Sequence, residues 1–267
     1  DIAGAKIHFM EWGVPDNPSV IMLHGNHAHA YWFQFIGGLL AKKYHFVVMS
    51  FSGMGDSDWR SRYDKDIFVE DVWGVVKETN LIRPVIVGHS FGGMVSLATA
   101  DKYGEQMSGL ILVDFVVRRP ENHIEWYKNM PPSKPPKIRS TKEELIQRFR
   151  LMPPQDCQNQ YLLDFIAEKS IREINGGWSW TFDPSTYDHL EVGNDQHKIL
   201  NQLDCPVSFI YGENTMEFDT GDSIKEMKEL LPEGSPVISL ADAQHHLMLD
   251  KPLEFVDELE KLIKDFF

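Results

Sequence analysis

Short apolar runs alternate along the chain with stretches whose apolar residues recur at helical spacing. The runs lie at residues 19–23, 46–49, 85–87, 109–113, 207–211 and 237–240. Runs that are apolar throughout are typical of parallel strands buried on both faces. Between two of them, Val69, Val72, Trp73 and Val76 share one face of a helix predicted over 66–80. This alternation predicts an α/β fold on a mostly parallel, doubly wound sheet, with ligands bound at the carboxyl ends of the strands.

Further elements extend this core at its edges. Residues 6–11 alternate apolar and polar side chains and predict a half-buried edge strand. Residues 31–43 predict a helix packed on the sheet. The apolar spacing of Phe255, Leu259 and Ile263 predicts a C-terminal helix with one face toward the core.

The alternation stops after about residue 116 and resumes near residue 196. Proline pairs interrupt the intervening segment at 131–132, 135–136 and 153–154. Thr141 and Glu144 form a capping box that predicts a short helix over 142–150. We predict one core domain of residues 1–116 and 196–267, with residues 117–195 inserted as a helical cap.

The inserted segment carries more aromatic residues than a connector needs. Most of them are expected to pack the cap on the core, but together they predict an apolar, aromatic-lined pocket. We take Trp126, Trp178 and Trp180 as the candidate substrate-binding residues.

A candidate nucleophile follows the strand predicted at 85–87, which continues as Gly88-His89-Ser90-Phe91-Gly92 and then as a helix over 93–103. A strand, a G-x-S-x-G turn and a helix form a nucleophile elbow, in which a strained turn exposes the serine. The two glycines remove side chains that would collide at so sharp a turn. The nucleophile is therefore predicted to be Ser90, and the helix behind it directs N–H groups toward a developing oxyanion.

A second oxyanion donor is expected from the loop that follows the strand at 19–23 and begins with His24-Gly25-Asn26. In α/β enzymes of this kind, this loop contributes one backbone N–H and the residue after the nucleophile contributes the other. We assign the two N–H groups to Asn26 and Phe91. His245, in the loop after the last predicted strand, is placed to reach the serine.

Metal binding must be considered at His24, His27 and His29, which lie close together in the sequence. A metallohydrolase pattern would bring a carboxylate within a few residues, and none occurs between residues 23 and 42. We therefore predict histidines that line the pocket or face solvent. Neither a metal nor a cofactor is expected.

Composition and charge exclude several partners. The net charge of -14 and the isoelectric point of about 5.2 oppose binding to nucleic acid and to anionic lipid. No apolar run reaches the length of a membrane span, and residues 1–4 lack the pattern of a retained signal peptide. Cys157 and Cys205 indicate neither a zinc site nor a disulfide scaffold. We expect a cytoplasmic protein that acts on a small molecule, with no indication of its oligomeric state.

The motifs as a set resemble the α/β-hydrolase superfamily. The resemblance covers nearly the whole chain and rests on Gly88 to Gly92, His24-Gly25-Asn26, Gly53 to Ser57 and His245 to Pro252. The second and third motifs are most similar to the haloalkane dehalogenase and coelenterazine-luciferase branch. Enzymes of that branch use an aspartate followed by tryptophan where this chain has Ser90-Phe91. Displacing halide requires a carboxylate whose ester water can cleave, whereas serine would form a stable ether. Dehalogenase and epoxide hydrolase activities are therefore not expected.

The resemblance implies a triad of serine, histidine and an acid. It favours His245 over the neighbouring His246 as the base, because the first histidine of the family's His-His pattern is the catalytic one. Members commonly place the acid where this chain has Thr215, but some branches place it at the end of the preceding strand, which here is Asp114. We predict Asp114 as the acid. The fallback acids are Glu217 and Asp219, followed by Glu213.

The predicted function is a serine hydrolase that cleaves carboxylic esters of small to medium, largely apolar substrates through an acyl-enzyme. A carbon–carbon bond hydrolase of the type that acts on aromatic degradation products uses the same residues and stays open, as does a lyase or a cofactor-free oxygenase. A ligand-binding receptor on the same fold is an alternative of another class.

Overall fold

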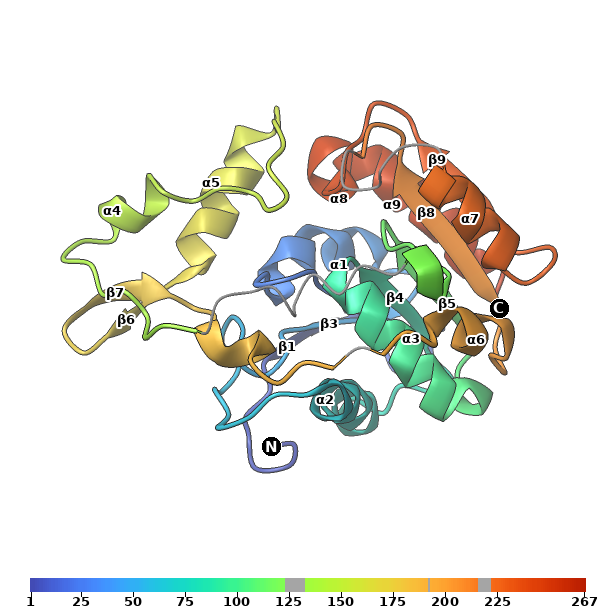
Figure 1. Ribbon diagram of the computed structural model, residues 1–267, viewed down its shortest axis with the longest axis horizontal. Helices are drawn as coiled ribbons and strands as arrows, with labels where there is room; N and C mark the ends of the chain where they lie inside the picture. The colour runs from blue at the N-terminus through green and yellow to red at the C-terminus, as the bar shows by residue number, and fades with distance from the viewer. Residues whose placement is uncertain (123–132, 192, 216–221) are drawn as a thin grey trace.

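The computed structural model describes residues 1–122, 133–191, 193–215 and 222–267 (Figure 1). Its central strands are β1 (Phe9–Trp12), β2 (Ser19–Leu23), β3 (His45–Met49), β4 (Val85–His89), β5 (Gly109–Val113), β8 (Val207–Gly212) and β9 (Val237–Leu240). They form one seven-stranded sheet in the order β1-β3-β2-β4-β5-β8-β9. Only β1 runs antiparallel to its neighbour among these strands. The predicted mostly parallel α/β sheet is confirmed.

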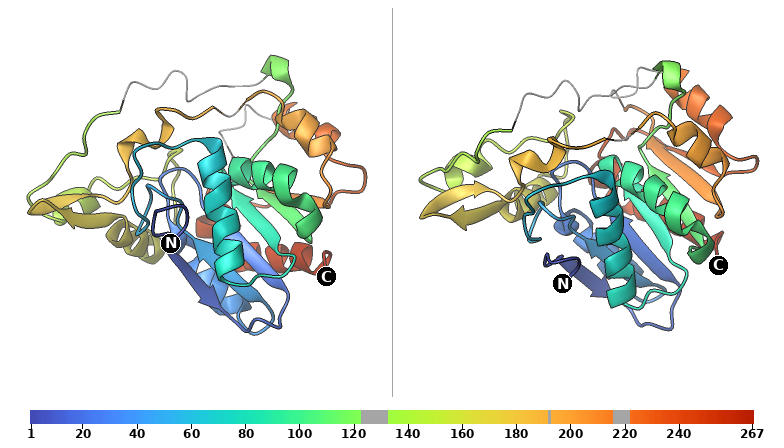
Figure 2. Two further views of the ribbon diagram at one scale, coloured as in Figure 1. Left: turned by 90° about the horizontal axis from the view of Figure 1, so that it is seen from below. Right: turned by 60° about the horizontal axis from the view of Figure 1, so that its bottom comes forward.

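Helices cover both faces of this sheet (Figure 2). They are η1 (Ala30–Phe33), α1 (Gln34–Leu40), α2 (Lys65–Glu78), α3 (Phe91–Tyr103), η2 (Gly104–Gln106), α6 (Gln196–Asn201), α7 (Asp222–Leu230), α8 (Leu247–Asp250) and α9 (Pro252–Lys264), where η denotes a 3₁₀ helix. Helix α3 packs against α2 and α6, and α1 packs against α9 on the opposite face. Within the described part of the chain, no helix combines the length and apolar character needed to cross a bilayer.

Side chains of each central strand alternate between two hydrophobic cores. In β2, Ile21 and Leu23 join the core beneath α2 and α3, whereas Val20 and Met22 join the core beneath α1 and α9. Every residue of β2 is buried. Burial of one such side chain contributes roughly 1.5–3 kcal/mol to the stability of the fold, so apolar residues are favoured on both faces of the strand. This is why the strand sequence is apolar throughout rather than alternating.

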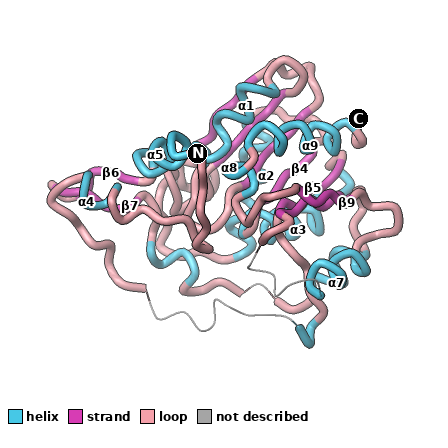
Figure 3. The backbone as a smooth tube through the Cα atoms, turned by 90° about the horizontal axis from the view of Figure 1, so that it is seen from above, coloured by secondary structure: helices cyan, strands magenta, loops and turns pink. Residues whose placement is uncertain are grey.

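Much of the segment between β5 and β8 forms a lobe beside this core, on the side away from α7 and α9 (Figure 3). The lobe contains α4 (Glu143–Ile146), α5 (Gln160–Lys169), β6 (Ile171–Ile174), β7 (Gly177–Trp180) and η5 (Pro184–Tyr187), whereas η3 (Pro120–Asn122) lies beside α7. The helix expected over 142–150 is thus present in shorter form, and the lobe is not purely helical. Its role as a lid over the site stays a prediction.

The hairpin of β6 and β7 was not predicted, although the sequence carries its signal. Asn175 and Gly176 connect the two strands with φ angles of 50° and 77°. Two positive φ angles in succession are those of a type I′ turn, for which Asn-Gly is the preferred pair. The prolines and aromatic residues of this segment predicted a helical cap, and the Asn-Gly turn adds a hairpin to it.

Several hydrogen bonds fasten the lobe to the core. Ser170 Oγ lies 2.9 Å from His29 Nε2, and the Asn159 side-chain amide donates to the Leu249 carbonyl at 2.7 Å. These contacts join the two ends of α5 to segments that follow β2 and β9. The lobe is therefore held near the carboxyl ends of the parallel strands.

Candidate active site

Ser90 lies in the turn between β4 and α3 with a backbone conformation that few residues adopt. Its φ is 53° and its ψ is -119°. A conformation of this kind costs roughly 1–3 kcal/mol and persists only where the surrounding structure fixes it. The Ser90 N–H donates to the Val113 carbonyl at 3.0 Å, and the Ser90 carbonyl accepts from the Gly93 N–H at 2.8 Å. These bonds hold the strained turn at the carboxyl edge of the sheet.

The glycines on either side of Ser90 allow the backbone to pack closely. A Cβ on Gly88 would lie 2.4 Å from the Gly92 carbonyl oxygen, and a Cβ on Gly92 would lie 2.5 Å from the Leu23 carbonyl oxygen. Both distances are far below van der Waals contact. The second contact brings the start of α3 against the end of β2, so the loop after β2 lies beside Ser90.

His245 connects Ser90 to Asp114. Its Nε2 lies 3.0 Å from Ser90 Oγ, and its Nδ1 lies 2.7 Å from Asp114 Oδ2. When Nδ1–H donates to the carboxylate, Nε2 is the acceptor for the serine hydroxyl, as a general base requires. The structure thus brings together the three residues that the sequence analysis selected.

Asp114 is buried, and donors from the chain surround its carboxylate. Oδ1 accepts from the Gly212 N–H at 2.8 Å and from the Thr215 hydroxyl at 3.0 Å. Burial raises the pKa of Asp114 above its usual range, and the hydrogen bonds from His245, Gly212 and Thr215 oppose that shift. From the sequence, Thr215 was notable only as the position where relatives commonly have the acid. Its hydroxyl instead donates to the acid on the neighbouring strand.

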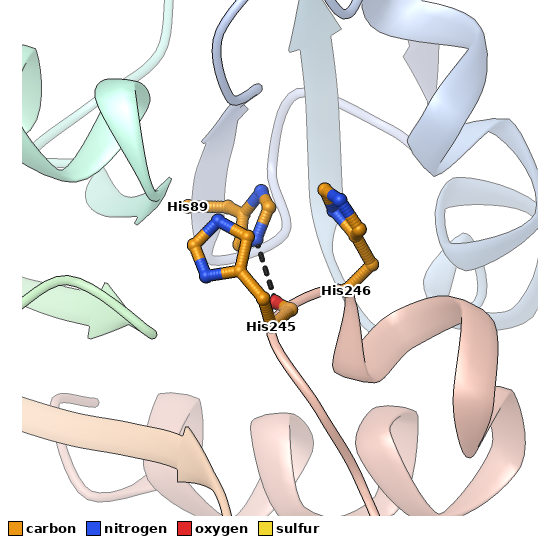
Figure 4. Close-up of side chains that lie close together, drawn as sticks. All are labelled: His89, His245 and His246. Carbon is orange, nitrogen blue, oxygen red and sulfur yellow. Dashed lines mark hydrogen bonds between the residues drawn. The ribbon is translucent and has the colours of Figure 1, made fainter. Parts of the chain in front are cut away.

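Of the alternatives that the structure describes, Glu213 and His246 have other partners. Glu213 is exposed and accepts from the Asp242 N–H at 3.3 Å, while Glu217 and Asp219 lie outside the described residues. The ring of His246 packs against Trp32, with the ring centres 5.2 Å apart. Figure 4 shows that the rings of His245 and His246 extend to different sides of the chain.

His89 is a buried neighbour of the base that the sequence analysis did not select. Its Nε2 donates to the backbone carbonyl of His245 at 2.9 Å (Figure 4). The bond links the end of β4 to the loop that carries the base. His89 occupies the x position next to the nucleophile in the G-x-S-x-G turn, and this proximity is the signal that could have found it.

Among the described residues, one histidine group is close enough together to be considered as a metal site. It consists of His89, His245 and His246. Their candidate ligand atoms lie within 4.8 Å of one another. A metal needs free lone pairs directed at one point. His89 Nε2 already donates to a carbonyl, and both nitrogens of His245 are engaged with Ser90 and Asp114. The group therefore fits hydrogen bonding around the base better than a metal site.

The two residues proposed as oxyanion donors, Phe91 and Asn26, both lie in segments close to Ser90. Phe91 is the first residue of α3, so its N–H has no acceptor within the helix. Asn26 lies in the loop after β2, where a Cβ on the preceding Gly25 would be 3.3 Å from the Ser90 Cβ. This loop is thus in contact with the nucleophile, as the oxyanion assignment requires.

His24, His27 and His29 each have a separate structural partner. His24 Nδ1 lies 2.8 Å from the Gly25 carbonyl, and His27 stacks on Phe182 with ring centres 4.0 Å apart. His29 reaches the lobe through Ser170, as described above. Burial lowers the pKa of His24 and His27 to about 4 and that of His29 to about 3. The three rings are therefore neutral near pH 7, and their partners lie in different directions.

Two of the predicted substrate-binding tryptophans lie away from Ser90. Trp178 and Trp180 lie on β7, and Figures 1 and 2 place this strand at the end of the lobe away from α3. The ring of Trp180 lies 6.4 Å from that of Phe149. Trp126 lies outside the described residues. A role of these tryptophans in substrate binding stays a prediction.

An apolar cavity of about 320 Å³ lies where the lobe meets the core. Tyr31, Trp32 and Phe35 line it from the core, and Leu162 and Phe165 line it from α5. Trp32 also packs on His246, so the cavity lies behind the histidine loop rather than at Ser90. Its lining includes Phe165 of the inserted segment but neither Trp178 nor Trp180, so the predicted substrate pocket stays a prediction.

Comparison with known proteins identifies related sequences along most of the chain. A family model described as alpha/beta hydrolase fold matches residues 18–172. A serine hydrolase-like protein of Danio rerio is 24% identical over 96% of this chain and 83% of its own length. The sn-1-specific diacylglycerol lipase ABHD11 of Danio rerio is 23% identical over 92% and 78%. Epoxide hydrolase 3 of Xenopus tropicalis is 25% identical over 99% and 75%.

Solved structures share the fold at low sequence identity. A thioesterase domain from the curacin biosynthetic pathway aligns with a TM-score of 0.80 and 20% identity, covering 97% of each chain. The crystal structure of E-2-(acetamidomethylene)succinate hydrolase aligns with a TM-score of 0.79 and 19% identity, covering 99% of this chain and 97% of that one. Likeness at this identity establishes the arrangement of the elements and leaves the reaction open.

The close packing of Gly92 predicts that Gly92→Ala destabilises the protein. The added methyl would meet two backbone carbonyls at the end of β2, which cannot move without disturbing the sheet, so we expect a loss of about 1–3 kcal/mol or more in the free energy of unfolding. Urea unfolding measures it. The control is Gly38→Ala, at an exposed position of α1 where a Cβ meets nothing within 4 Å. Equal stability of the two variants would contradict the contact.

The lowered histidine pKa values predict that acid weakens the fold. His24 and His29 have folded pKa values of about 4 and 3, below the unfolded value of about 6.5. As the pH falls below 6.5, the unfolded chain therefore binds more protons than the folded chain. The stability present above pH 6.5 is lost as the pH decreases to the folded pKa. We expect each of these two histidines to lower the free energy of unfolding by about 2 kcal/mol between pH 7 and pH 5.

Urea unfolding at both pH values measures this loss. The raised pKa values of Asp71 and Asp114 act in the opposite direction, so the informative comparison is between the wild type and His29→Gln. The variant should lose less stability on acidification. An equal loss in both proteins would mean that His29 does not carry the effect.

Proposed function

Because this chain belongs to the α/β-hydrolase fold family, we propose that it is a serine hydrolase that cleaves carboxylic esters. The observation that carries the proposal is the continuous hydrogen-bonded chain from Asp114 through His245 to Ser90, with distances of 2.7 Å and 3.0 Å. A nucleophile, a base and an orienting acid in this geometry are the requirement for acyl transfer.

The proposed reaction has two steps. Ser90 Oγ attacks the ester carbonyl carbon while its proton passes to His245 Nε2, and Asp114 stabilises the imidazolium. The bond to the alcohol oxygen then breaks, His245 returns the proton to that oxygen, and the acyl group stays on Ser90. Water next gives a proton to His245 as its oxygen attacks the acyl carbon. The bond from that carbon to Ser90 Oγ then breaks, His245 returns the proton to Oγ, and the carboxylic acid leaves.

The tetrahedral intermediates of both steps carry a negative oxygen. We assign its stabilisation to the N–H groups of Phe91 and Asn26, supported by the positive end of the α3 dipole. A single donor of this kind contributes about 2.7–4 kcal/mol to lowering the barrier. The contact between Gly92 and the end of β2 supports the assignment, because it keeps the segments of the two donors close to the nucleophile.

Serine chemistry favours an ester over an epoxide as the substrate. Opening an epoxide by a carboxylate gives an ester that water can cleave, whereas opening it by Ser90 would leave an ether on the enzyme. We propose substrates with small to medium, largely apolar groups, in line with the aromatic residues of the inserted segment.

The serine assignment predicts that Ser90→Ala abolishes ester turnover and leaves the melting temperature nearly unchanged. Loss of Oγ removes the attacking atom but no core packing. Hydrolysis of p-nitrophenyl esters from acetate to decanoate and labelling by a fluorophosphonate measure the effect. Ser61→Ala, at an exposed serine, is the matched control and should behave as the wild type.

The outcomes separate the proposed function from its alternatives. Serine-dependent labelling with steady turnover supports an esterase, and the best chain length reports the size of the pocket. Labelling without ester turnover would contradict ester cleavage and favour a carbon–carbon bond hydrolase or a receptor. Activity retained in Ser90→Ala would refute the nucleophile.

The acid assignment predicts that Asp114→Asn lowers kcat by about 10⁴-fold, as the loss of the orienting carboxylate does in other triads. The amide no longer holds His245 in the tautomer that accepts the serine proton. Steady-state kinetics on the best p-nitrophenyl ester measures this decrease. Glu213→Gln is the control and should change kcat less than about two-fold. A mild effect of Asp114→Asn would move the acid to Glu217 or Asp219.

A further inference from the structure

Tyr187, a residue of the lobe outside the machinery described above, contacts both proposed oxyanion residues. Its hydroxyl donates to Asn26 Oδ1, and its ring meets that of Phe91 edge-on with the centres 5.4 Å apart. We propose that Tyr187 is a positioning residue, which holds the Asn26 loop and the start of α3 so that both backbone N–H groups meet one oxyanion. The inference rests on the proposed function and adds a part of the lobe to it.

The side chain of Asn26 needs such a partner because packing does not fix it. Asn26 is exposed, whereas Tyr187 is only 6% exposed. A hydrogen bond from a buried, rigid ring restrains a loop that would otherwise be free to shift. Displacement of a reacting group by about 1 Å can cost 10²-fold in rate, so small movements of the Asn26 N–H matter.

The hydroxyl of Tyr187 is suited to act as a permanent donor. Burial raises its pKa well above the usual value, and a hydrogen bond from the His27 backbone opposes that shift in part. The hydroxyl therefore keeps its proton under all working conditions. Its oxygen faces the backbone of His27 while its proton is directed to Asn26, so it contacts two successive residues of the oxyanion loop.

The segment that carries Tyr187 is itself fastened to the core. The Asp183 N–H donates to the Gly53 carbonyl at 2.7 Å, and the Tyr63 hydroxyl donates to Asp183 Oδ2 at 2.9 Å. Phe182 stacks on His27 with an interplanar angle of 8°. A residue can position another only if its own place is fixed, and these contacts meet that condition.

The test compares Tyr187→Phe with Tyr103→Phe. The first variant keeps the ring and removes the bond to Asn26, and the second removes a hydroxyl that donates to Glu70 at 3.1 Å, outside the site. We expect Tyr187→Phe to lower kcat roughly 10-fold while KM changes less than about two-fold, because the N–H acts on the oxyanion rather than on the bound ester. The rate of Ser90 labelling by the fluorophosphonate should fall similarly. Tyr103→Phe should change neither.

A double-mutant cycle distinguishes positioning through Asn26 from a general structural effect. Asn26→Ala keeps the backbone N–H and removes the acceptor of the Tyr187 hydroxyl. If Tyr187 acts through Asn26, the double variant is no slower than the slower single variant. Losses that multiply would overturn the proposal.

The remaining outcomes separate this inference from the proposed function. If the wild type is active and labelled, and Tyr187→Phe has the same kcat and labelling rate, the role of Tyr187 is overturned while the proposed function stands. A wild type that shows neither turnover nor labelling overturns the serine hydrolase and this inference together. Tyr187→Phe could instead lower both the activity and the melting temperature, with an effect on kcat that multiplies with that of Asn26→Ala. This result would assign Tyr187 a packing role and overturn positioning.

Discussion

The contact between the Ser90 turn and the end of β2 is the constraint on which the candidate site depends. Ser90 adopts a strained conformation, and Gly92 approaches the Leu23 carbonyl more closely than any side chain would allow. The strain costs roughly 1–3 kcal/mol and is offset by a sheet buried on both faces. Ser90 is thereby held at the carboxyl end of the central strand β4, between the loop after β2 and the strand β5.

Burial of the Asp114 carboxylate imposes a second condition on the surrounding residues. A buried carboxylate is stable only when donors satisfy its oxygens, and here His245, Gly212 and Thr215 supply them. Thr215 Oγ1 lies 3.0 Å and 3.1 Å from the two oxygens of Asp114. A second carboxylate at residue 215 would place two like charges together. With the acid placed at the end of β5, a neutral hydroxyl at residue 215 is therefore favoured over a carboxylate.

Neutral histidines and aromatic rings form the seam between the lobe and the core. His27 stacks on Phe182, and His29 meets Ser170, in each case across the seam. Because burial keeps both rings uncharged near pH 7, they can pack against aromatic and hydroxyl groups without an unpaired charge. The loop after β2 thus faces the nucleophile on one side and the lobe on the other, and Tyr187 spans both.

Local patterns in the sequence determined the sheet, the elbow and the residues that meet there. Apolar runs identify strands because a strand buried on both faces admits little else, and G-x-S-x-G after such a run identifies the turn because only glycine tolerates its contacts. The same reasoning placed Ser90, Asp114 and the loop of His245 at one end of the sheet, since parallel strands bring their carboxyl ends together. The choice of His245 as the base and Asp114 as the acid came from the resemblance to the α/β-hydrolase superfamily. The Asn175-Gly176 turn was also readable locally and was overlooked.

Only the tertiary structure decided which residues support these groups. The roles of Thr215, His89 and Tyr187 depend on contacts with residues far away in the sequence: Thr215 with Asp114, His89 with His245, and Tyr187 with Asn26. The tryptophans of the lobe illustrate the converse, since their aromatic character was evident but their place on the outer hairpin was not. Composition reports which side chains are available, and the packing of the lobe on the core decides where they lie.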